Sequence, residues 1–191
     1  MSAAPDHLLT QGRLLTLDEF DRLPEDSAVR YELREGVLHI SRRAASLQRR
    51  VVANLTSTLN DQLPDGWRAL SDVEVVLVEQ WPATVCHADA VVTSATAGDP
   101  QLKRLHAHDV LVVTEFLSPG SARMSHRAEY AKVGIPAYWV LEIRDRITLA
   151  ESRLIRGEYE TYFQDRGMFY TGHPFELMVD IDSLPRRRTR P

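Results

Sequence analysis

Two acidic residues interrupt apolar segments of this sequence at positions where a carboxylate would be buried. Asp89 lies in the run Val85–Val92, and Glu115 lies in the run Asp109–Leu117. A buried carboxylate is costly unless it meets a cation, hydrogen-bond donors or a raised pKa. A divalent metal held by both carboxylates, with water completing its shell, would satisfy both groups. Mg²⁺ prefers oxygen ligands of this kind and can activate water for the hydrolysis of a phosphodiester.

The spacing of the two acidic residues also permits a simpler interpretation. Each carboxylate could lie at the end of a strand, where water or a basic side chain satisfies it. An Asp followed by a Glu on a later strand is a weak signal by itself. The two interpretations therefore stay open at the level of these residues.

The elements around Glu115 predict a mixed sheet in an α/β (α+β) domain. The nearly continuous apolar run Asp109–Leu117 is typical of a strand that is covered on both faces. Ser121–Val133 is expected to be a helix that ends at Gly134, and Tyr138–Ile143 is expected to be a second buried strand. A strand, a helix and a strand in this order predict at least one parallel pair.

The segment before Asp89 predicts a helix, a hairpin and a second helix. Thr16 and Glu19 form a capping-box pattern that starts a short helix. Two alternating runs flank Glu35-Gly36 and predict a β-hairpin. Apolar residues at a spacing of four predict a helix over Ser46–Leu63. The other expected elements are strands at Trp67–Leu70, Val73–Val78 and Phe175–Ile181, a helical turn at Gln101–Leu105 and a meander over Ile147–Tyr170.

Length and composition indicate one folded domain. Residues 1–13 are expected to form a flexible leader, residues 14–184 the domain and residues 185–191 a basic tail. We expect no signal peptide, because Met1–Gln11 lacks a basic segment followed by an apolar stretch. We expect no membrane span, because the apolar runs are too short to cross a bilayer. The single cysteine, Cys86, excludes an internal disulfide and favours a cytoplasmic setting. The net charge of −4 argues against non-specific coating of nucleic acid, but a nuclease with a carboxylate site is compatible with it.

An ordered series of short motifs resembles one known family. The motifs are Tyr31–Gly36, Gln48–Leu55, Ala88-Asp89, Glu115–Ser121 and the segment from Tyr130 to Trp139. Together they resemble the Uma family of proposed restriction endonucleases, a branch of the PD-(D/E)XK superfamily, over about Leu17–Leu184. The resemblance implies a restriction-endonuclease-like fold with an N-terminal hairpin and a C-terminal meander. It also implies a homodimer that uses Mg²⁺ (or Mn²⁺) to cut nucleic acid, with DNA as the expected substrate.

The resemblance assigns a role to each candidate site residue. Asp89 and Glu115 fall on the metal-binding acids of the family, and Glu32 falls on the acidic residue of its hairpin. Glu32 is expected to assist the metal or the water. Gln48, at a position where the family often has His, and His126 are expected to complete the site.

One departure from the superfamily pattern bears on catalysis. The superfamily has a Lys two residues after the Glu, and here that position is Leu117. The Uma family tends to place its Lys four residues before the Tyr, where this sequence has His126. An unperturbed His is mostly neutral above about pH 6.5, so we expect weakened stabilisation of charge at the phosphate. The alternative function is a catalytically weakened or inactive nuclease-fold protein that binds nucleic acid or protein.

His87 lies two residues before Asp89, so both side chains are expected on the same side of their strand. His87 is a candidate for an additional metal ligand. A partly buried, hydrogen-bonded His is the simpler interpretation.

Overall fold

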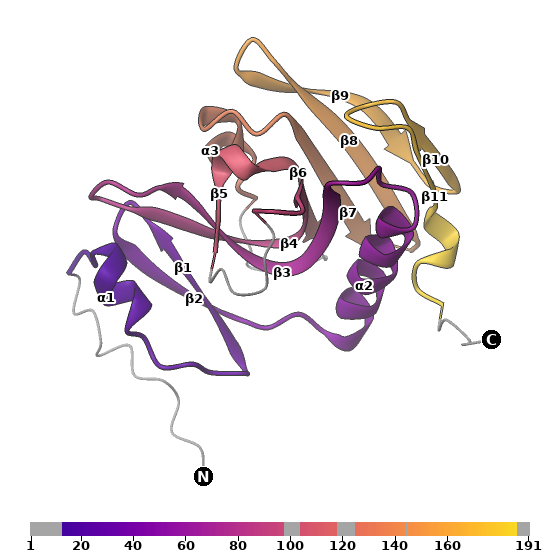
Figure 1. Ribbon diagram of the computed structural model, residues 1–191. Helices are drawn as coiled ribbons and strands as arrows, with labels where there is room; N and C mark the ends of the chain where they lie inside the picture. Colours follow the sequence, from indigo (N-terminus) through magenta and orange to yellow (C-terminus); the bar gives the residue numbers. More distant parts are fainter. Residues whose placement is uncertain (1–12, 98–103, 118–124, 144, 187–191) are drawn as a thin grey trace.

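A large mixed sheet, a small second sheet and three α-helices make up the part of the chain that the structure describes (Figure 1). This structure is a computed structural model, and it describes residues 13–97, 104–117, 125–143 and 145–186. The helices are α1 (Leu17–Asp21), α2 (Ser46–Asn60) and α3 (Arg127–Lys132). The strands are β1 (Val29–Arg34), β2 (Val37–Arg42), β3 (Trp67–Val78), β4 (Thr84–Ser94), β5 (Leu105–His106), β6 (Val110–Leu117), β7 (Ala137–Ile143), β8 (Ile147–Ile155), β9 (Glu158–Asp165), β10 (Met168–Thr171) and β11 (Leu177–Asp180).

The large sheet has the strand order β2-β1-β4-β6-β7-β8-β9, and β3 and β5 lie off this path. Strand β3 pairs antiparallel with β4, and β5 pairs parallel with β3. The parallel pair expected around Glu115 is confirmed, because β6 and β7 run in the same direction. The expected α+β class with a mixed sheet is therefore confirmed.

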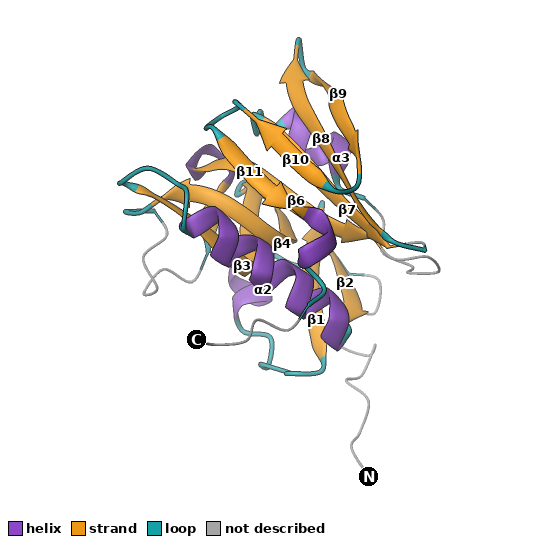
Figure 2. Cartoon of the chain, turned by 90° about the vertical axis from the view of Figure 1, so that its right-hand side faces the viewer, coloured by secondary structure: helices purple, strands orange, loops and turns teal. Residues whose placement is uncertain are grey.

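Apolar side chains cover both faces of this sheet. Helix α2 lies across one face, next to the small β10–β11 sheet (Figure 2). Its Leu55 belongs to the same core cluster as Val112 of β6 and Trp139 of β7. On β6, the next residue, Val113, belongs instead to a cluster with Tyr130 of α3. Alternate residues of a strand point to opposite faces, so β6 is buried on both sides, as its apolar run predicts.

The N-terminal elements agree with the sequence predictions. The side chain of Thr16 accepts a hydrogen bond from the backbone N–H of Glu19, and the Glu19 side chain accepts one from the backbone N–H of Thr16. This capping box starts α1, which closes over the hairpin through Phe20 and Leu33. Glu35 and Gly36 form the hairpin turn with φ of 47° and 79°. Glycine suits such a positive φ because it has no Cβ.

Two sequence predictions of element bounds are wrong, the division before Asp89 into two strands and the end of the second helix. Trp67–Leu70 and Val73–Val78 are one continuous strand, β3, because pairing with β4 continues on both sides of Asp72. Helix α2 ends at Asn60, before Leu63. The last two strands, β10 and β11, pair with each other in a separate sheet. The helix expected over Ser121–Val133 is described only as α3, Arg127–Lys132, and residues 118–124 lie outside the described part.

The expected leader, most of the basic tail and most of the turn at Gln101–Leu105 also lie outside the described residues. The proposed domain bounds therefore stay a prediction. Among the helices that the structure describes, none is long and apolar enough to cross a membrane.

Candidate active site

The candidate site lies where the large sheet divides. Strand β3 pairs with β4 along almost its whole length, so β1 and β6 share the other edge of β4. Val85 of β4 pairs with Leu33 of β1, and pairing with β6 begins only at Ala90, opposite Thr114. The intervening segment of β4, residues 86–89, has neither β1 nor β6 as a ladder partner. A buried backbone N–H without a strand partner needs another acceptor.

Two of the predicted site carboxylates bind backbone N–H groups at this fork. The backbone N–H of His87 donates to Oε1 of Glu32 at 3.0 Å. The backbone N–H of Phe116 donates to Oδ2 of Asp89 at 2.7 Å. Side chains from β1 and β4 thus bind the backbone where the strands separate. This places Glu32, from the hairpin, close to the strand that carries Asp89.

Asp89 is 1% exposed and binds three donors from different elements. Besides the Phe116 N–H, Oδ1 accepts from Nη1 of Arg30 at 2.9 Å and from Nε2 of Gln48 at 3.2 Å. Arg30 comes from β1, and Gln48 comes from the first turn of α2. The predicted neighbour Gln48 therefore does reach Asp89, and the guanidinium of Arg30 balances the charge of Asp89.

Glu115 is fully buried and has a separate set of donors. Nδ1 of His126 lies 2.7 Å from Oε1, and the hydroxyl of Tyr138 donates to Oε2 at 2.6 Å. Burial raises the pKa of Tyr138, and the charge of Glu115 and this hydrogen bond raise it further. Tyr138 therefore stays protonated and acts as a fixed donor to Glu115.

His126 lies between two carboxylates. It precedes the first residue of α3, and its side chain has no exposed surface. Its Nε2 lies 3.5 Å from Oε2 of Glu32, opposite the nitrogen that binds Glu115. Burial lowers the pKa of His126, but hydrogen bonds to Cys86, Glu115 and Glu32 raise it more, to about 11. In the metal-free protein, Cys86 and the two carboxylates therefore make His126 easier to protonate than an unperturbed His. The expected weakening of charge stabilisation in the metal-loaded site stays a prediction.

Asp72 of β3 adds a third carboxylate beside Asp89. It lies between the pairs Ser71–Ala90 and Val73–Ala88, and is therefore next to Asp89 on the neighbouring strand. Like charges on neighbouring strands repel each other. Arg30 separates them, because its Nη2 donates to Oδ1 of Asp72 at 2.5 Å while its Nη1 binds Asp89.

Sequence reasoning missed Arg30, Asp72 and Tyr138. The available signal for Arg30 was its position two residues before Glu32, which puts both side chains on one face of β1. Tyr138 lies on the strand next to Glu115, a relationship that depends on the parallel register of β6 and β7. His87 is 5% exposed, and its Nε2 lies 3.4 Å from Oδ1 of Asp72. This contact agrees with the simpler interpretation, a partly buried His with a polar partner.

The chemistry of Asp89 and Glu115 fits a hard divalent cation. Mg²⁺ is usually bound by one or two carboxylates, with water and substrate phosphates as its other ligands. Within the described ranges, no group of three or more His, Cys, Asp and Glu side chains is arranged to hold a metal ion. Asp89 and Glu115 each bind a separate set of hydrogen-bond donors.

Comparisons with known proteins identify the family and support the fold. The model of the Uma2 family, described as "Putative restriction endonuclease", matches residues 17–177. The crystal structure of a "putative nuclease belonging to DUF820" from Anabaena variabilis superposes with a TM-score of 0.66 at 19% sequence identity. The superposition covers 89% of this chain and 97% of the other, and it supports the same fold. No curated protein sequence matches this chain. Because the family match spans most of its length, the chain belongs to the Uma2 family.

Proposed function

We propose that this protein is a metal-dependent endonuclease that hydrolyses phosphodiester bonds of nucleic acid, with DNA as the first substrate to test. The observation that carries the proposal is the pair Asp89 and Glu115. The two carboxylates come from neighbouring strands, β4 and β6, and are buried where the sheet divides. The family match and the nuclease-like fold support the same activity.

Asp89 and Glu115 would hold the cation, Mg²⁺ or Mn²⁺. When bound, such an ion neutralises phosphate charge and lowers the pKa of a coordinated water. The surrounding residues fix the orientation of the two acids. Gln48 and the Phe116 N–H hold Asp89, while Tyr138 and His126 hold Glu115. Glu32 is held by the His87 N–H and would assist the water or the metal.

His126 is the candidate for a buried positive charge at the site, because hydrogen bonds to Cys86, Glu115 and Glu32 raise its pKa. The superfamily lysine position is Leu117, which bears no charge. His126 lies against Glu115 and Glu32. We infer that His126 partly replaces the lysine by electrostatic stabilisation at the site. Because its side chain is fully buried, it acts through these carboxylates.

The missing lysine also favours a second candidate function. In this alternative, the protein keeps the fold and binds nucleic acid or a protein partner with weak or no cleavage. Losing one group that stabilises transition-state charge typically costs about a hundredfold to a thousandfold in rate. Cleavage and binding therefore have to be measured separately to distinguish a weak nuclease from a binding module.

Cleavage of supercoiled plasmid and of labelled oligonucleotides, with Mg²⁺, Mn²⁺ or EDTA, tests the proposal. We expect nicked or linear products with either metal and none with EDTA. Asp65→Asn removes one negative charge at an exposed position, as a change of Asp89 to Asn would at the site, and it should cut like the parent. Binding of the oligonucleotide without cleavage would favour the alternative function. Neither cleavage nor binding would contradict the nuclease and also the nucleic-acid-binding form of the alternative.

We further propose a cytoplasmic homodimer. Cutting both strands of a duplex favours two sites related by a two-fold axis. Light scattering at micromolar concentrations should give about twice the monomer mass of 21.7 kDa. A mass equal to the monomer across that range would contradict the dimer and leave the cleavage proposal untouched.

A further inference from the structure

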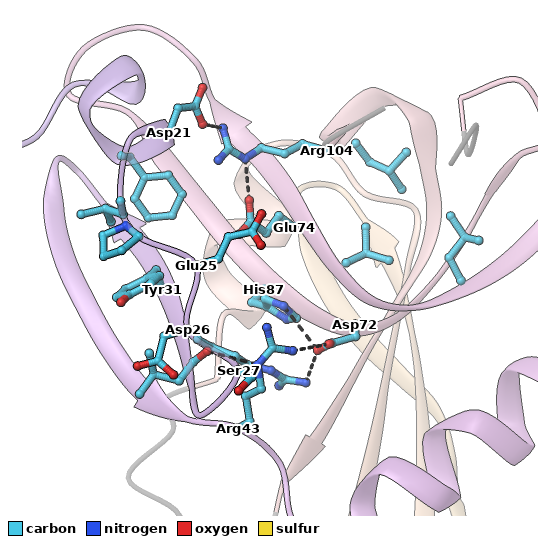
Figure 3. Close-up of a pocket in the computed structure, with 18 residues that line it drawn as sticks. Asp21, Glu25, Asp26, Ser27, Tyr31, Arg43, Asp72, Glu74, His87 and Arg104 are labelled. Atoms are coloured by element: carbon cyan, nitrogen blue, oxygen red, sulfur yellow. Dashed lines mark hydrogen bonds and ion pairs between the residues drawn. The ribbon is translucent and has the colours of Figure 1, made fainter. Parts of the chain in front are cut away.

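A cavity of about 930 Å³ lies next to the candidate site, between α1, the β1–β2 hairpin and β3 (Figure 3). This volume is within the usual range for pockets that bind small molecules, roughly 300–1,000 Å³. Arg30 lines the cavity and also binds Asp89. A single side chain therefore connects the cavity to the proposed metal-binding acids.

At one end of the cavity, three nitrogen-bearing side chains converge on the carboxylate of Asp72 (Figure 3). Arg30 and Arg43 donate to its two oxygens at 2.5 Å and 2.8 Å, and Nε2 of His87 lies 3.4 Å from Oδ1. Burial raises the pKa of Asp72, but His87 and the two guanidinium groups lower it more, so Asp72 is ionised. The arrangement is a built anion site whose occupant is a side chain of the same protein.

Asp72 is a partly exposed occupant of this site. It is 42% exposed, and its φ of 61° lies in the left-handed region, which is uncommon for a residue other than glycine. Held backbone strain of this kind clusters at ligand-binding and switch positions. Arg30, which is 8% exposed, keeps Asp89 as a counter-ion without Asp72. The positive charge of the buried Arg30 guanidinium therefore stays balanced by Asp89 when the Asp72 carboxylate moves away.

We propose that Asp72 occupies the place of a substrate phosphate, and that Arg30, Arg43 and His87 form a subsite for one phosphate of a nucleic-acid strand. Guanidinium groups bind carboxylate and phosphate oxygens in the same geometry, so a phosphate can replace the carboxylate on the same donors. Displacement of Asp72 would let a strand bind beside Asp89. The inference rests on the proposed function, because it places a substrate phosphate next to the metal-binding acids.

The opposite end of the cavity limits the subsite to a single phosphate. Arg104 is already neutralised there by Asp21 and Glu74. Glu25 and Asp26 also line the cavity. These carboxylates would repel a second phosphate. After displacement of Asp72, Arg43 is the guanidinium left for the phosphate, while Arg30 keeps Asp89 as its counter-ion.

Binding of a short fluorescent single-stranded DNA, measured in EDTA so that no cleavage occurs, tests the subsite. Asp72→Asn removes the competing charge, and we expect it to bind about tenfold more tightly than the parent, the gain of one charge-assisted contact. Adding Arg43→Gln to Asp72→Asn should reverse the gain. Asp65→Asn changes net charge equally at an exposed site and should bind like the parent. Asp72→Gly suits the positive φ and serves as a second variant if Asp72→Asn does not fold.

Inorganic phosphate, which carries a single phosphate group, identifies the chemistry that is bound. It should displace the DNA from Asp72→Asn at lower concentration than from the Asp72→Asn/Arg43→Gln double variant. The subsite is refuted if Asp72→Asn and Asp72→Gly bind no more tightly than the parent, or if Asp65→Asn gains as much. A tenfold gain in a protein that cuts no substrate with Mg²⁺ would support the subsite while contradicting the enzymatic proposal.

Discussion

Replacing His126 with Gln should lower the free energy of unfolding by about 3–5 kcal/mol near pH 6, the usual cost of removing one partner of a buried ion pair. His126 is fully buried between Glu115 and Glu32. A neutral Gln leaves two buried carboxylates without the positive charge between them. The Tyr138 hydroxyl still binds Glu115, so the fold should survive while its stability falls.

The loss of stability in His126→Gln should depend on pH, and the raised pKa of His126 determines whether the loss grows or shrinks as the pH rises. This pKa is about 6.5 in an unfolded chain, and it is raised to about 11 in the folded protein. The folded state therefore binds one more proton than the unfolded state between these values. The contribution of His126 to stability is complete below pH 6.5 and is lost as the pH rises towards 11. From this group alone, the free energy of unfolding of the parent should fall as the pH rises through that window.

Urea denaturation of the parent and of His126→Gln, at several pH values between about 6 and 9.5, measures both effects. The difference between the two proteins should be largest near pH 6 and should narrow as the pH rises. His108→Gln is the matched control, because the His108 side chain is 80% exposed, and a change at such a site usually alters stability by less than about 0.5 kcal/mol. Parallel stability curves for the parent and His126→Gln would show that His126 is neutral in the fold.

The fold was predictable from the sequence where local patterns carry the information. Alternation around Glu35-Gly36 predicts the hairpin, and the apolar run through Glu115 predicts a buried strand; both follow from neighbouring residues. Asp72 shows where local reading fails. Ser and Asp are common in turns, so Ser71 and Asp72 suggest a break, yet the ladder with β4 continues past them.

The residue pattern alone predicted only the acidic residues of the candidate site, and the family resemblance added Gln48 and His126. Asp89 and Glu115 stand out because a carboxylate interrupts an apolar strand, which a sequence shows directly. Their partners depend on which strands become neighbours. Arg30 reaches Asp89 from β1, and Tyr138 reaches Glu115 from β7, contacts that no spacing within one segment encodes. The charge of His126 likewise follows from two carboxylates brought together by the fold.

Neutralising either proposed metal ligand should nearly abolish cleavage. We expect Asp89→Asn and Glu115→Gln each to lower the rate with Mg²⁺ by at least about a hundredfold, the effect of removing one group that stabilises transition-state charge. Glu115→Gln keeps a side-chain oxygen for the Tyr138 hydroxyl. Asp89→Asn keeps one acceptor oxygen, which can bind either Arg30 or the Phe116 N–H, and it loses the hydrogen bond to the other of these donors. The changes are therefore close in shape and differ mainly in charge.

Loss of cleavage alone does not separate a metal ligand from a buried carboxylate that only supports the fold. Glu151 provides the matched control, because it is 1% exposed and accepts hydrogen bonds from Arg153 and Thr171, away from the site. Glu151→Gln should be less stable than the parent. At an assay temperature well below its midpoint of unfolding, it should cleave DNA at the parent's rate.

A thermal shift with Mn²⁺ completes the distinction, because a ligand that binds only the folded state raises the midpoint of unfolding, and more so the further its concentration exceeds its Kd. The parent and Glu151→Gln should be stabilised by Mn²⁺ to the same extent, whereas Asp89→Asn and Glu115→Gln should gain little. If both site variants retain the full Mn²⁺ shift, the ion binds elsewhere and the two acids only support the fork in the sheet. If they lose the shift while the parent cuts nothing, the metal site is real and the protein is a binding module built on it.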